Sequence, residues 1–310
     1  MRSKVNHRYW IIDPNVFLNL RRFKLLIAEV GCNHKGSMEI AHELIKVAAI
    51  FCKVDVIKFQ KRTNRELLSL DEYDRPHPNP NNSYGATYGQ HREFLELDIS
   101  QHQQLKDWCE ELNVEYSTSV WDLTAAKEMI PLQPHMLKIP SACNMDMELA
   151  KYLCGNFGGE IHVSFGMSDQ AEEEEIISVY SKLGRSKDLV IYACTSGYPV
   201  PFEDLCLLEI QRLKNSYEST VKTIGFSGHH LGIAADIAAL ALGASVFERH
   251  FTLDRTWKGT DHAASLEPDG MRRLARDLKN VVLALQHKRD EILPIEWEQR
   301  KKLKRKVNDK

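Results

Sequence analysis

Residues 23–60 read FKLLIAEVGCNHKGSMEIAHELIKVAAIFCKVDVIKFQ. The stretch opens with an apolar run at 23–30, which predicts a β-strand. Ser37 then fits a helix N-cap, and apolar residues recur at helical spacing as far as Ala49. A second apolar run at 54–60 predicts the next strand. Strand, crossover helix and strand together form the unit from which parallel sheets are built.

The same alternation continues along the chain. Six further strands are predicted at residues 114–120, 136–140, 160–166, 189–195, 223–227 and 245–251. Helical patterns separate them at residues 101–112, 123–130, 145–154, 171–183, 202–213 and 232–242, and a last amphipathic stretch runs over 269–286. A doubly wound open sheet would use the same local pattern, but eight strands favour an aldolase-type α/β fold, the (β/α)8 TIM barrel.

We therefore expect three parts in the chain. Residues 23–290 would form the catalytic barrel, residues 1–22 an N-terminal extension, and residues 291–310 a charged C-terminal tail. The run of lysine and arginine in the tail is typical of a solvated segment, and this interpretation is preferred over nucleic-acid binding.

Composition narrows the function further. The net formal charge of −2 gives no overall field that would attract nucleic acid or an anionic membrane. The seven cysteines are odd in number and include no Cys-x-x-Cys pair, which argues against a disulfide framework or a structural zinc site. Asp13 and Pro14 interrupt the stretch in which a signal peptide would be unbroken and apolar, so we expect no signal peptide. No apolar run is as long as a membrane span. We expect a cytoplasmic protein that binds neither nucleic acid nor membranes.

Two lysines mark the expected mouth of the barrel, where the carboxyl ends of the strands meet. Lys58 and Lys138 lie within otherwise apolar strands, and a buried lysine is costly unless an anion pairs with it. Serine and threonine hydroxyls end several other strands. Two ammonium groups and a set of hydroxyls fit a binding site for a phosphate and a carboxylate. A Schiff-base lysine, as in class I aldolases, is the competing interpretation.

Two histidines are candidate metal ligands. His229 lies two residues after Ser227, and His250 two residues after Glu248, so each pair shares one strand face. The two strands are neighbours, and both imidazoles can therefore point into one mouth. Two protein ligands would leave positions open for water or substrate, as in a catalytic metal site. The alternative is a pair of hydrogen-bonded core histidines.

Seven ordered motifs resemble those of the sialic acid synthase (N-acetylneuraminate synthase) family. They are residues 27–37, 57–60, 88–92, 194–199, 224–229, 247–254 and 259–268. The resemblance extends from about Phe23 to the helix after Pro268. It implies a transferase that joins phosphoenolpyruvate to an N-acylated hexosamine such as N-acetylmannosamine, in its open aldehyde form, and releases phosphate and a sialic acid.

The resemblance also implies residue roles. Phosphoenolpyruvate would be held by Lys58, Thr118, Lys138, Ser141, Ser164, Ser196 and Ser227. His229 and His250 would bind a divalent ion, Mn²⁺ or else Mg²⁺ or Co²⁺, which would activate the aldehyde. The sugar would contact Gln60, Tyr198 and Asp261. Glu29 would lie beside the enol carbon and steer a water onto it, and His250 and Asp261 complete the catalytic candidates.

Three departures from the family pattern concern the sugar. The family places a carboxylate just after Ser141, where this chain has Ala142-Cys143-Asn144, and Gly228 replaces an aspartate before His229. Family members also carry a C-terminal antifreeze-like domain that delivers an arginine across a dimer, and residues 300–305 resemble the linker to it. We expect a more open sugar site and a homodimer formed through barrel surfaces. Candidates to replace the arginine are Arg62, Arg75 and Lys258.

Two alternative functions stay open. One is a related synthase that makes a different sugar acid, such as a deaminated, legionaminic or shorter 3-deoxy acid. The other is a non-catalytic barrel that serves as a binding subunit. The second is disfavoured by Glu29, the two lysines and the two histidines, because a scaffold needs no polar mouth.

Overall fold

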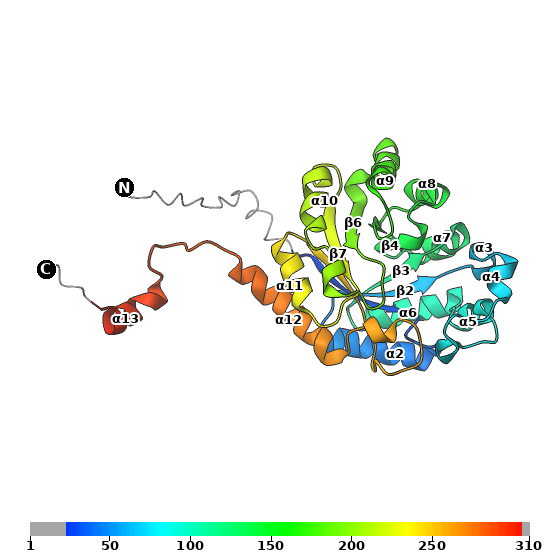
Figure 1. Ribbon diagram of the computed structural model, residues 1–310, viewed down its shortest axis with the longest axis horizontal. Helices are drawn as coiled ribbons and strands as arrows, with labels where there is room; N and C mark the ends of the chain where they lie inside the picture. Colours follow the sequence, from blue (N-terminus) through cyan, green and yellow to red (C-terminus); the bar gives the residue numbers. More distant parts are fainter. Residues whose placement is uncertain (1–22, 306–310) are drawn as a thin grey trace, which may run out of the picture.

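Eight parallel strands close into a barrel in chain order in the computed structural model, which describes residues 23–305 (Figure 1). The strands are β1 Leu25–Gly31, β2 Val56–Lys61, β3 Glu115–Val120, β4 Met136–Ile139, β5 Glu160–Ser164, β6 Leu189–Cys194, β7 Thr223–Gly228 and β8 Val246–His250. The predicted (β/α)8 barrel is confirmed, and each strand lies where the sequence predicts it. The expected extension at 1–22 and the last residues of the expected tail, 306–310, lie outside the described residues.

Helices surround the barrel. They are α2 Met38–Lys46, α6 Ile99–Glu111, α7 Leu123–Met129, α8 Met147–Asn156, α9 Gln170–Lys182, α10 Glu209–Tyr217, α11 Ala234–Ala241 and α12 Pro268–Ala284. Ser37 caps α2 as predicted, because its hydroxyl accepts a hydrogen bond from the amide of Ile40 at 3.2 Å. The helix predicted at 202–213 is instead a short 3₁₀ turn followed by α10. Cys206 lies between them in the left-handed region at φ +46°, which a continuous helix does not allow.

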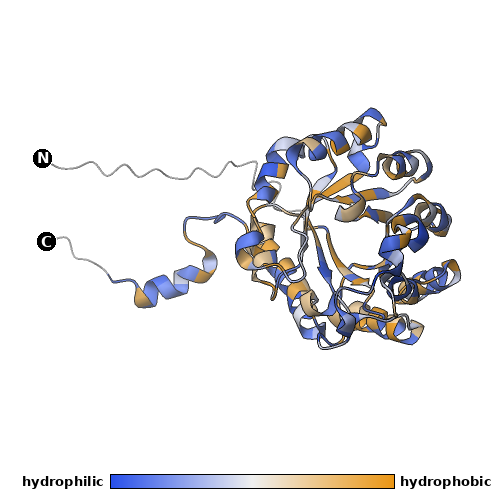
Figure 2. Ribbon diagram, turned by 45° about the vertical axis from the view of Figure 1, so that its right-hand side comes forward, coloured by the Kyte–Doolittle hydropathy of each residue, from blue (hydrophilic) through white to orange (hydrophobic). Residues whose placement is uncertain are grey.

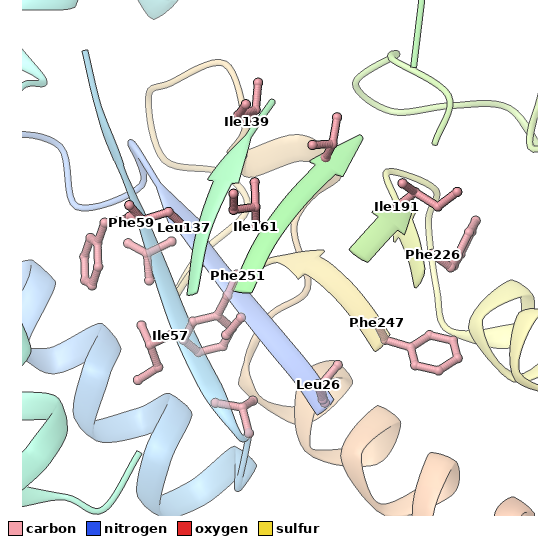
Figure 3. Close-up of a cluster of buried hydrophobic side chains, with 14 of the residues drawn as sticks. Leu26, Ile57, Phe59, Leu137, Ile139, Ile161, Ile191, Phe226, Phe247 and Phe251 are labelled. Carbon is pink, nitrogen blue, oxygen red and sulfur yellow. The ribbon is translucent and has the colours of Figure 1, made fainter. Parts of the chain in front are cut away.

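The core lies mainly between the strands and the helices. Strand residues that face outward meet the apolar faces of the helices, and Figure 3 shows part of this layer around Leu26, Ile57 and Phe59. In Figure 2 the surrounding helices carry both hydrophilic and hydrophobic residues, as expected where one face packs on a barrel. A second apolar cluster fills the barrel below its mouth, with Ile27, Val56, Met136, Val190, Tyr192 and Val246. The apolar cluster thus fills the barrel beneath the polar residues at the carboxyl ends of the strands.

The register of the strands brings polar residues to one level. Glu29 of β1 pairs with Lys58 of β2 on one side and with His250 of β8 on the other. The register then shifts between Glu29 and Gly31, where φ is +53°. This positive φ favours glycine, and a Cβ atom at this position would lie 2.8 Å from Nε2 of Gln60 and would displace that side chain.

The polar stretch after β2 is ordered and partly helical. It contains α3 Asn64–Leu67, α4 Leu70–Asp74, a 3₁₀ turn Pro80–Asn82 and α5 Tyr88–Phe94. The ring of Tyr73 lies directly over Gly89, where a Cβ atom would approach it to 2.2 Å, and Tyr84 stacks on Phe94 with ring centroids 5.0 Å apart. These contacts fold the stretch back on itself beside the mouth of the barrel.

The C-terminal helix α13 Pro294–Leu303 has no buried residue, and Figure 1 shows it set apart from the barrel. Within residues 23–305, no helix is both long enough and apolar enough to span a membrane.

Candidate active site

A cavity of about 350 Å³ opens at the carboxyl ends of the strands. All the predicted site residues except Thr118 line it. They are Glu29, Lys58, Gln60, Lys138, Ser141, Ser164, Ser196, Tyr198, Ser227, His229, His250 and Asp261. Residues from seven different strands or their following loops therefore converge on one volume.

Thr118 is the residue that the structure places elsewhere. It pairs in register with Phe59 and Leu137, which belong to the core between strands and helices. Its neighbour Ser119 points into the barrel instead, lines the cavity and accepts a hydrogen bond from Nζ of Lys58 at 2.8 Å. Since side chains alternate along a strand, only one of two adjacent hydroxyl residues can face the mouth. Ser119 takes the position expected for Thr118.

Two lysines and two carboxylates form a buried charge array in the cavity. Lys58 contacts Glu29 directly, and its Nζ lies 3.7 Å from Glu248. Lys138 also contacts Glu248, to which Ser227 donates a hydrogen bond at 3.2 Å. The lysines are paired with anions as expected, and the protein supplies these anions. Glu248 was missing from the predicted site, although its spacing of two from His250 put it on the same strand face.

The two carboxylates of the array differ in acidity. Burial raises the pKa of Glu29 above its usual range, and the neighbouring Lys58 only partly opposes this effect. Burial would also raise the pKa of Glu248, but Lys138 and Lys58 hold it well below its usual range. Although burial opposes it, Glu248 and Glu29 raise the pKa of Lys58. Glu29 is therefore the carboxylate of the array that takes up a proton more readily, as suits an acid–base group.

His229 and His250 face each other, with ring centroids 5.4 Å apart. Nδ1 of His229 donates to the carbonyl of Thr195 at 2.9 Å, which leaves the Nε2 lone pair free. Burial and the nearby His250 lower the pKa of His229 to about 3, so its ring is neutral. Nδ1 of His250 is buried without a hydrogen-bond partner and lies 3.8 Å from the carboxylate of Asp261. Two facing imidazoles with unpaired ring nitrogens fit a divalent ion.

The pair has no further ligand of the usual kind in place. Among residues 23–305, no group of three or more histidine, cysteine, aspartate or glutamate side chains is arranged to hold a metal ion. The metal site stays a prediction that rests on the two imidazoles.

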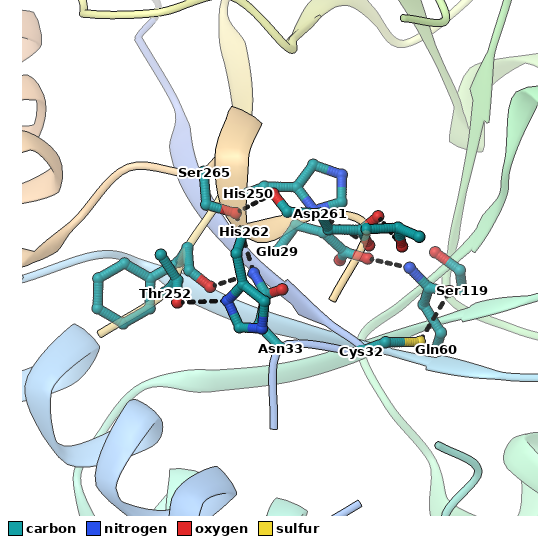
Figure 4. A network of polar contacts seen from close by, with 12 residues as sticks. Glu29, Cys32, Asn33, Gln60, Ser119, His250, Thr252, Asp261, His262 and Ser265 are labelled. Atoms are coloured by element: carbon teal, nitrogen blue, oxygen red, sulfur yellow. Dashed lines mark hydrogen bonds and ion pairs between the residues drawn. The ribbon is translucent and has the colours of Figure 1, made fainter. Parts of the chain in front are cut away.

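Asp261 is held over the mouth by a polar network that joins the loops after β1 and β8 (Figure 4). The amide of Asn33 donates to the carbonyl of Phe251 at 2.8 Å and to the hydroxyl of Ser265 at 2.9 Å. Ser265 in turn donates to the carbonyl of Asp261 at 2.7 Å. On the other side of the same view, Gln60 donates to Glu29 at 3.0 Å. The side chains of Asn33 and Ser265 thus hold the two loops together through hydrogen bonds.

Several cavity residues were not predicted as site residues. They are Cys32, His77, Tyr88, His91, Arg92, Ser119, Trp121, Cys194 and Glu248. Four of these nine come from the loop after β2, for which the motif at residues 88–92 was the signal in the sequence. Of the three candidates to replace an arginine at the sugar, only Arg62 lines the cavity, and Arg75 and Lys258 do not.

The fold and the site define a (β/α)8-barrel enzyme with a charged, histidine-bearing mouth, and comparison with known proteins gives its family. Residues 44–290 match the NeuB family, and the chain belongs to it. The chain is 34% identical to human N-acetylneuraminate-9-phosphate synthase, covering 91% of this chain and 77% of the relative. It is 32% identical to the N,N'-diacetyllegionaminic acid synthase of Campylobacter jejuni, covering 84% and 77%.

A solved structure is similar over nearly its whole length. It is the N-acetylneuraminic acid synthetase of Leptospira borgpetersenii in complex with citrate, with a TM-score of 0.76 and 26% identity, covering 92% of this chain and 94% of that one. The predicted resemblance to the sialic acid synthase family is confirmed, and so is the prediction of an enzyme.

Proposed function

We propose that the protein is a sugar-acid synthase that condenses phosphoenolpyruvate with an N-acylated hexosamine, such as N-acetylmannosamine, and releases phosphate and a sialic acid. The observation that carries the proposal is the combination of three features in one cavity. These are a cradle formed by two lysines and four serines, the facing imidazoles of His229 and His250, and the buried Glu29 with its raised pKa. The cradle consists of Lys58, Lys138, Ser141, Ser164, Ser196 and Ser227. The names of the similar synthases agree with this assignment.

The cradle is built to receive an anion. The hydroxyl of Ser164 is buried and has no hydrogen-bond partner, so a ligand would satisfy it. At Gly166 a Cβ atom would lie 2.4 Å from Oγ of Ser196 and 2.7 Å from Oγ of Ser141. Glycine at this position lets the two hydroxyls come together, and the amide of Gly166 donates to Oγ of Ser141 at 3.1 Å. Lys138 lines the same cavity. Hydroxyls supply directional donors and lysine supplies charge, which together suit a phosphate.

The chemistry assigns a role to each part. The enol carbon of phosphoenolpyruvate forms a bond to the aldehyde carbon as the enol double bond opens, and the aldehyde oxygen takes up the proton that Glu29 removes from the attacking water. A divalent ion held by His229 and His250 would polarise that oxygen and stabilise negative charge on it. Glu29 takes a proton from a water that attacks the phosphate-bearing carbon. The carbon–oxygen bond to phosphate then breaks, and the phosphate leaves from the cradle.

The sugar half of the site allows a second candidate. Gln60, Tyr198 and Asp261 line the cavity and would contact the aldose. After Ser141 the chain has Ala142-Cys143-Asn144, without the carboxylate that the family pattern predicts there. Because a legionaminic acid synthase is also among the similar proteins, a synthase of a different nonulosonic acid is the alternative. A homodimer through barrel surfaces stays a prediction.

The test measures phosphate released from phosphoenolpyruvate with a panel of aldoses, with and without Mn²⁺. The panel contains N-acetylmannosamine, mannose, diacetylated 6-deoxyhexoses and arabinose, and the phosphates of those that can carry one. We expect release with N-acylated hexoses. Turnover only of the short arabinose derivatives would replace the proposal with a 3-deoxy acid synthase, and no release with any aldose would contradict a condensing enzyme.

A further inference from the structure

Arg92 is a buried cation that lacks a counter-charge of its own. It is only 7% exposed and lines the cavity. Within the described part of the chain, no hydrogen bond or ion pair reaches its guanidinium, and its Nε is buried without a partner. The rings of Tyr88 and Trp121 flank it, with centroids 5.7 and 5.5 Å from the guanidinium carbon. Cation–π contacts hold the side chain in place but do not neutralise it.

Glu96, the acidic residue near Arg92, already forms an ion pair with another residue. Arg62 also lines the cavity beside Trp121, and its guanidinium carbon lies 5.7 Å from the centroid of that ring. It forms an ion pair with Glu96. We call this part of the cavity the outer wall. The other carboxylate oxygen of Glu96 accepts from the backbone amide of Arg62 at 3.0 Å. Burial and the charge of Arg62 lower the pKa of Arg92. Glu96 is therefore paired with Arg62, and Arg92 has no carboxylate of its own.

The other cations of the cavity differ from Arg92 in this respect. Lys58 contacts Glu29, and Lys138 contacts Glu248. Among the described lining residues, Arg92 is thus the lysine or arginine without a carboxylate within ion-pair distance. Burying an unpaired charge is costly, and such a side chain is expected where a ligand brings the missing anion.

The position of Arg92 separates it from the phosphoenolpyruvate cradle. Trp121 follows Ser119 by two residues at the end of β3, so the arginine pair lies further out than the contact between Lys58 and Ser119. His91 belongs to the same wall, and its Nδ1 accepts from the amide of Tyr84 at 3.1 Å. Burial and the nearby His77 lower the pKa of His91 to about 4, so its neutral ring carries a proton on Nε2 and can donate it.

We propose that Arg92, with Arg62 and His91 beside it, binds a phosphate on the terminal carbon of the aldose. This inference rests on the proposed function and names its substrate class: a phosphorylated N-acylhexosamine. The aldehyde carbon reacts at the cradle, so the terminal carbon lies at the far end of the sugar, toward the outer wall. The names of similar proteins do not decide the point, since they include both a 9-phosphate synthase and a legionaminic acid synthase.

The test compares Arg92→Gln with wild type and with Arg75→Gln. Arg75 is a matched control because it also stacks on Tyr88, at 5.5 Å, but is exposed and lies outside the cavity. The kcat/KM values for N-acetylmannosamine and its 6-phosphate are measured with Mn²⁺ and saturating phosphoenolpyruvate. We expect wild type and Arg75→Gln to prefer the phosphate at least 100-fold. In Arg92→Gln this preference should fall at least 30-fold, because the KM for the 6-phosphate rises. The KM for phosphoenolpyruvate should stay unchanged.

Two results would overturn the proposal. One is a wild type without preference for the phosphorylated aldose, and the other is an Arg92→Gln enzyme whose KM for phosphoenolpyruvate rises equally with both aldoses. Calorimetric binding of the two sugars separates this inference from the proposed function. Loss of binding of the 6-phosphate alone in Arg92→Gln would support the subsite even without turnover. Thermal unfolding adds a readout, because Arg92→Gln should be at least as stable as wild type, and marked destabilisation would indicate a structural arginine instead.

Discussion

Lys138 of β4 and Glu248 of β8 meet inside the barrel, although 110 residues separate them in the chain. Their contact joins opposite strands of the closed sheet, and Lys58 connects it to Glu29. An incoming anion therefore finds ammonium groups that are already oriented by carboxylates. Such preorganisation lowers the cost of aligning the groups during a reaction.

Removing Lys138 should affect both stability and binding. Lys138→Met leaves Glu248 buried with only Ser227 and the more distant Lys58, so we expect the free energy of unfolding to fall by about 3–5 kcal/mol. Phosphoenolpyruvate binding should weaken by roughly 2 kcal/mol, because a charged hydrogen bond to the ligand is lost. The double variant Lys138→Met/Glu248→Leu is the control: it should recover stability in urea unfolding but not affinity in calorimetry. Unchanged affinity in both Lys138→Met and Lys58→Met would place the cradle elsewhere.

The assignment of Ser119 in place of Thr118 can be tested by paired substitutions. Ser119→Ala removes the acceptor of the 2.8 Å hydrogen bond from Lys58 and should weaken phosphoenolpyruvate binding about tenfold, near ~1.4 kcal/mol. Thr118→Val changes a side chain that faces away from the cavity and should leave the dissociation constant within about twofold. The reverse pattern would restore the role first predicted for Thr118.

The metal prediction concerns His229 and His250. A chelator should abolish phosphate release and Mn²⁺ should restore it, and Mn²⁺ titration followed by electron paramagnetic resonance should show one site per chain. His250→Ala should lose that site, whereas His135→Ala, at an exposed position remote from the cavity, should keep it. Full activity of His250→Ala in the presence of chelator would contradict the predicted metal site.

Discrimination for the acyl group should be modest. The run after Ser141, Ala142-Cys143-Asn144, lacks the carboxylate that would hold the sugar, so one specific contact to the acylated aldose is missing. We expect kcat/KM for N-acetylmannosamine to exceed that for mannose by less than about a thousandfold, or ~4 kcal/mol. The same comparison with both 6-phosphates serves as the control. A larger ratio would mean that another group recognises the acyl chain.

Acid should destabilise the protein through its buried histidines. Burial and the nearby Lys61 lower the pKa of His102 from its ordinary 6.5 to about 3. Below pH 6.5 the unfolded chain protonates this ring while the folded protein does not, so stability falls as the pH drops toward 3. One such group costs about 1.4 kcal/mol per pH unit, or ~2 kcal/mol between pH 6.5 and 5. The free energy of unfolding in urea is measured between pH 6.5 and 5 for wild type and His102→Gln. It should fall less steeply with decreasing pH in His102→Gln than in wild type, and an equal pH dependence would contradict the assignment.

The strands could be predicted because their residues are buried on both faces and read as apolar runs between helices. The period of two then oriented residues such as Lys58 and Gln60, or Ser227 and His229, correctly toward the mouth. The same rule, applied strictly, would have chosen Ser119 and included Glu248. Arg92 could not be predicted in this way. It lies on a short helix in an irregular loop, and only the tertiary path of that loop turns it toward the barrel.

The loop after β2 closes on itself through Tyr73 over Gly89 and Tyr84 on Phe94, and it is anchored to the barrel near Arg62 and Glu96. Residues 62–97 carry the proposed phosphate subsite, whereas the lysines and serines of the cradle lie outside this segment. We therefore expect this segment to be exchangeable without loss of phosphoenolpyruvate binding. A chimera that takes this segment from a synthase of another sugar acid should acquire a new aldose preference on an unaltered phosphoenolpyruvate platform.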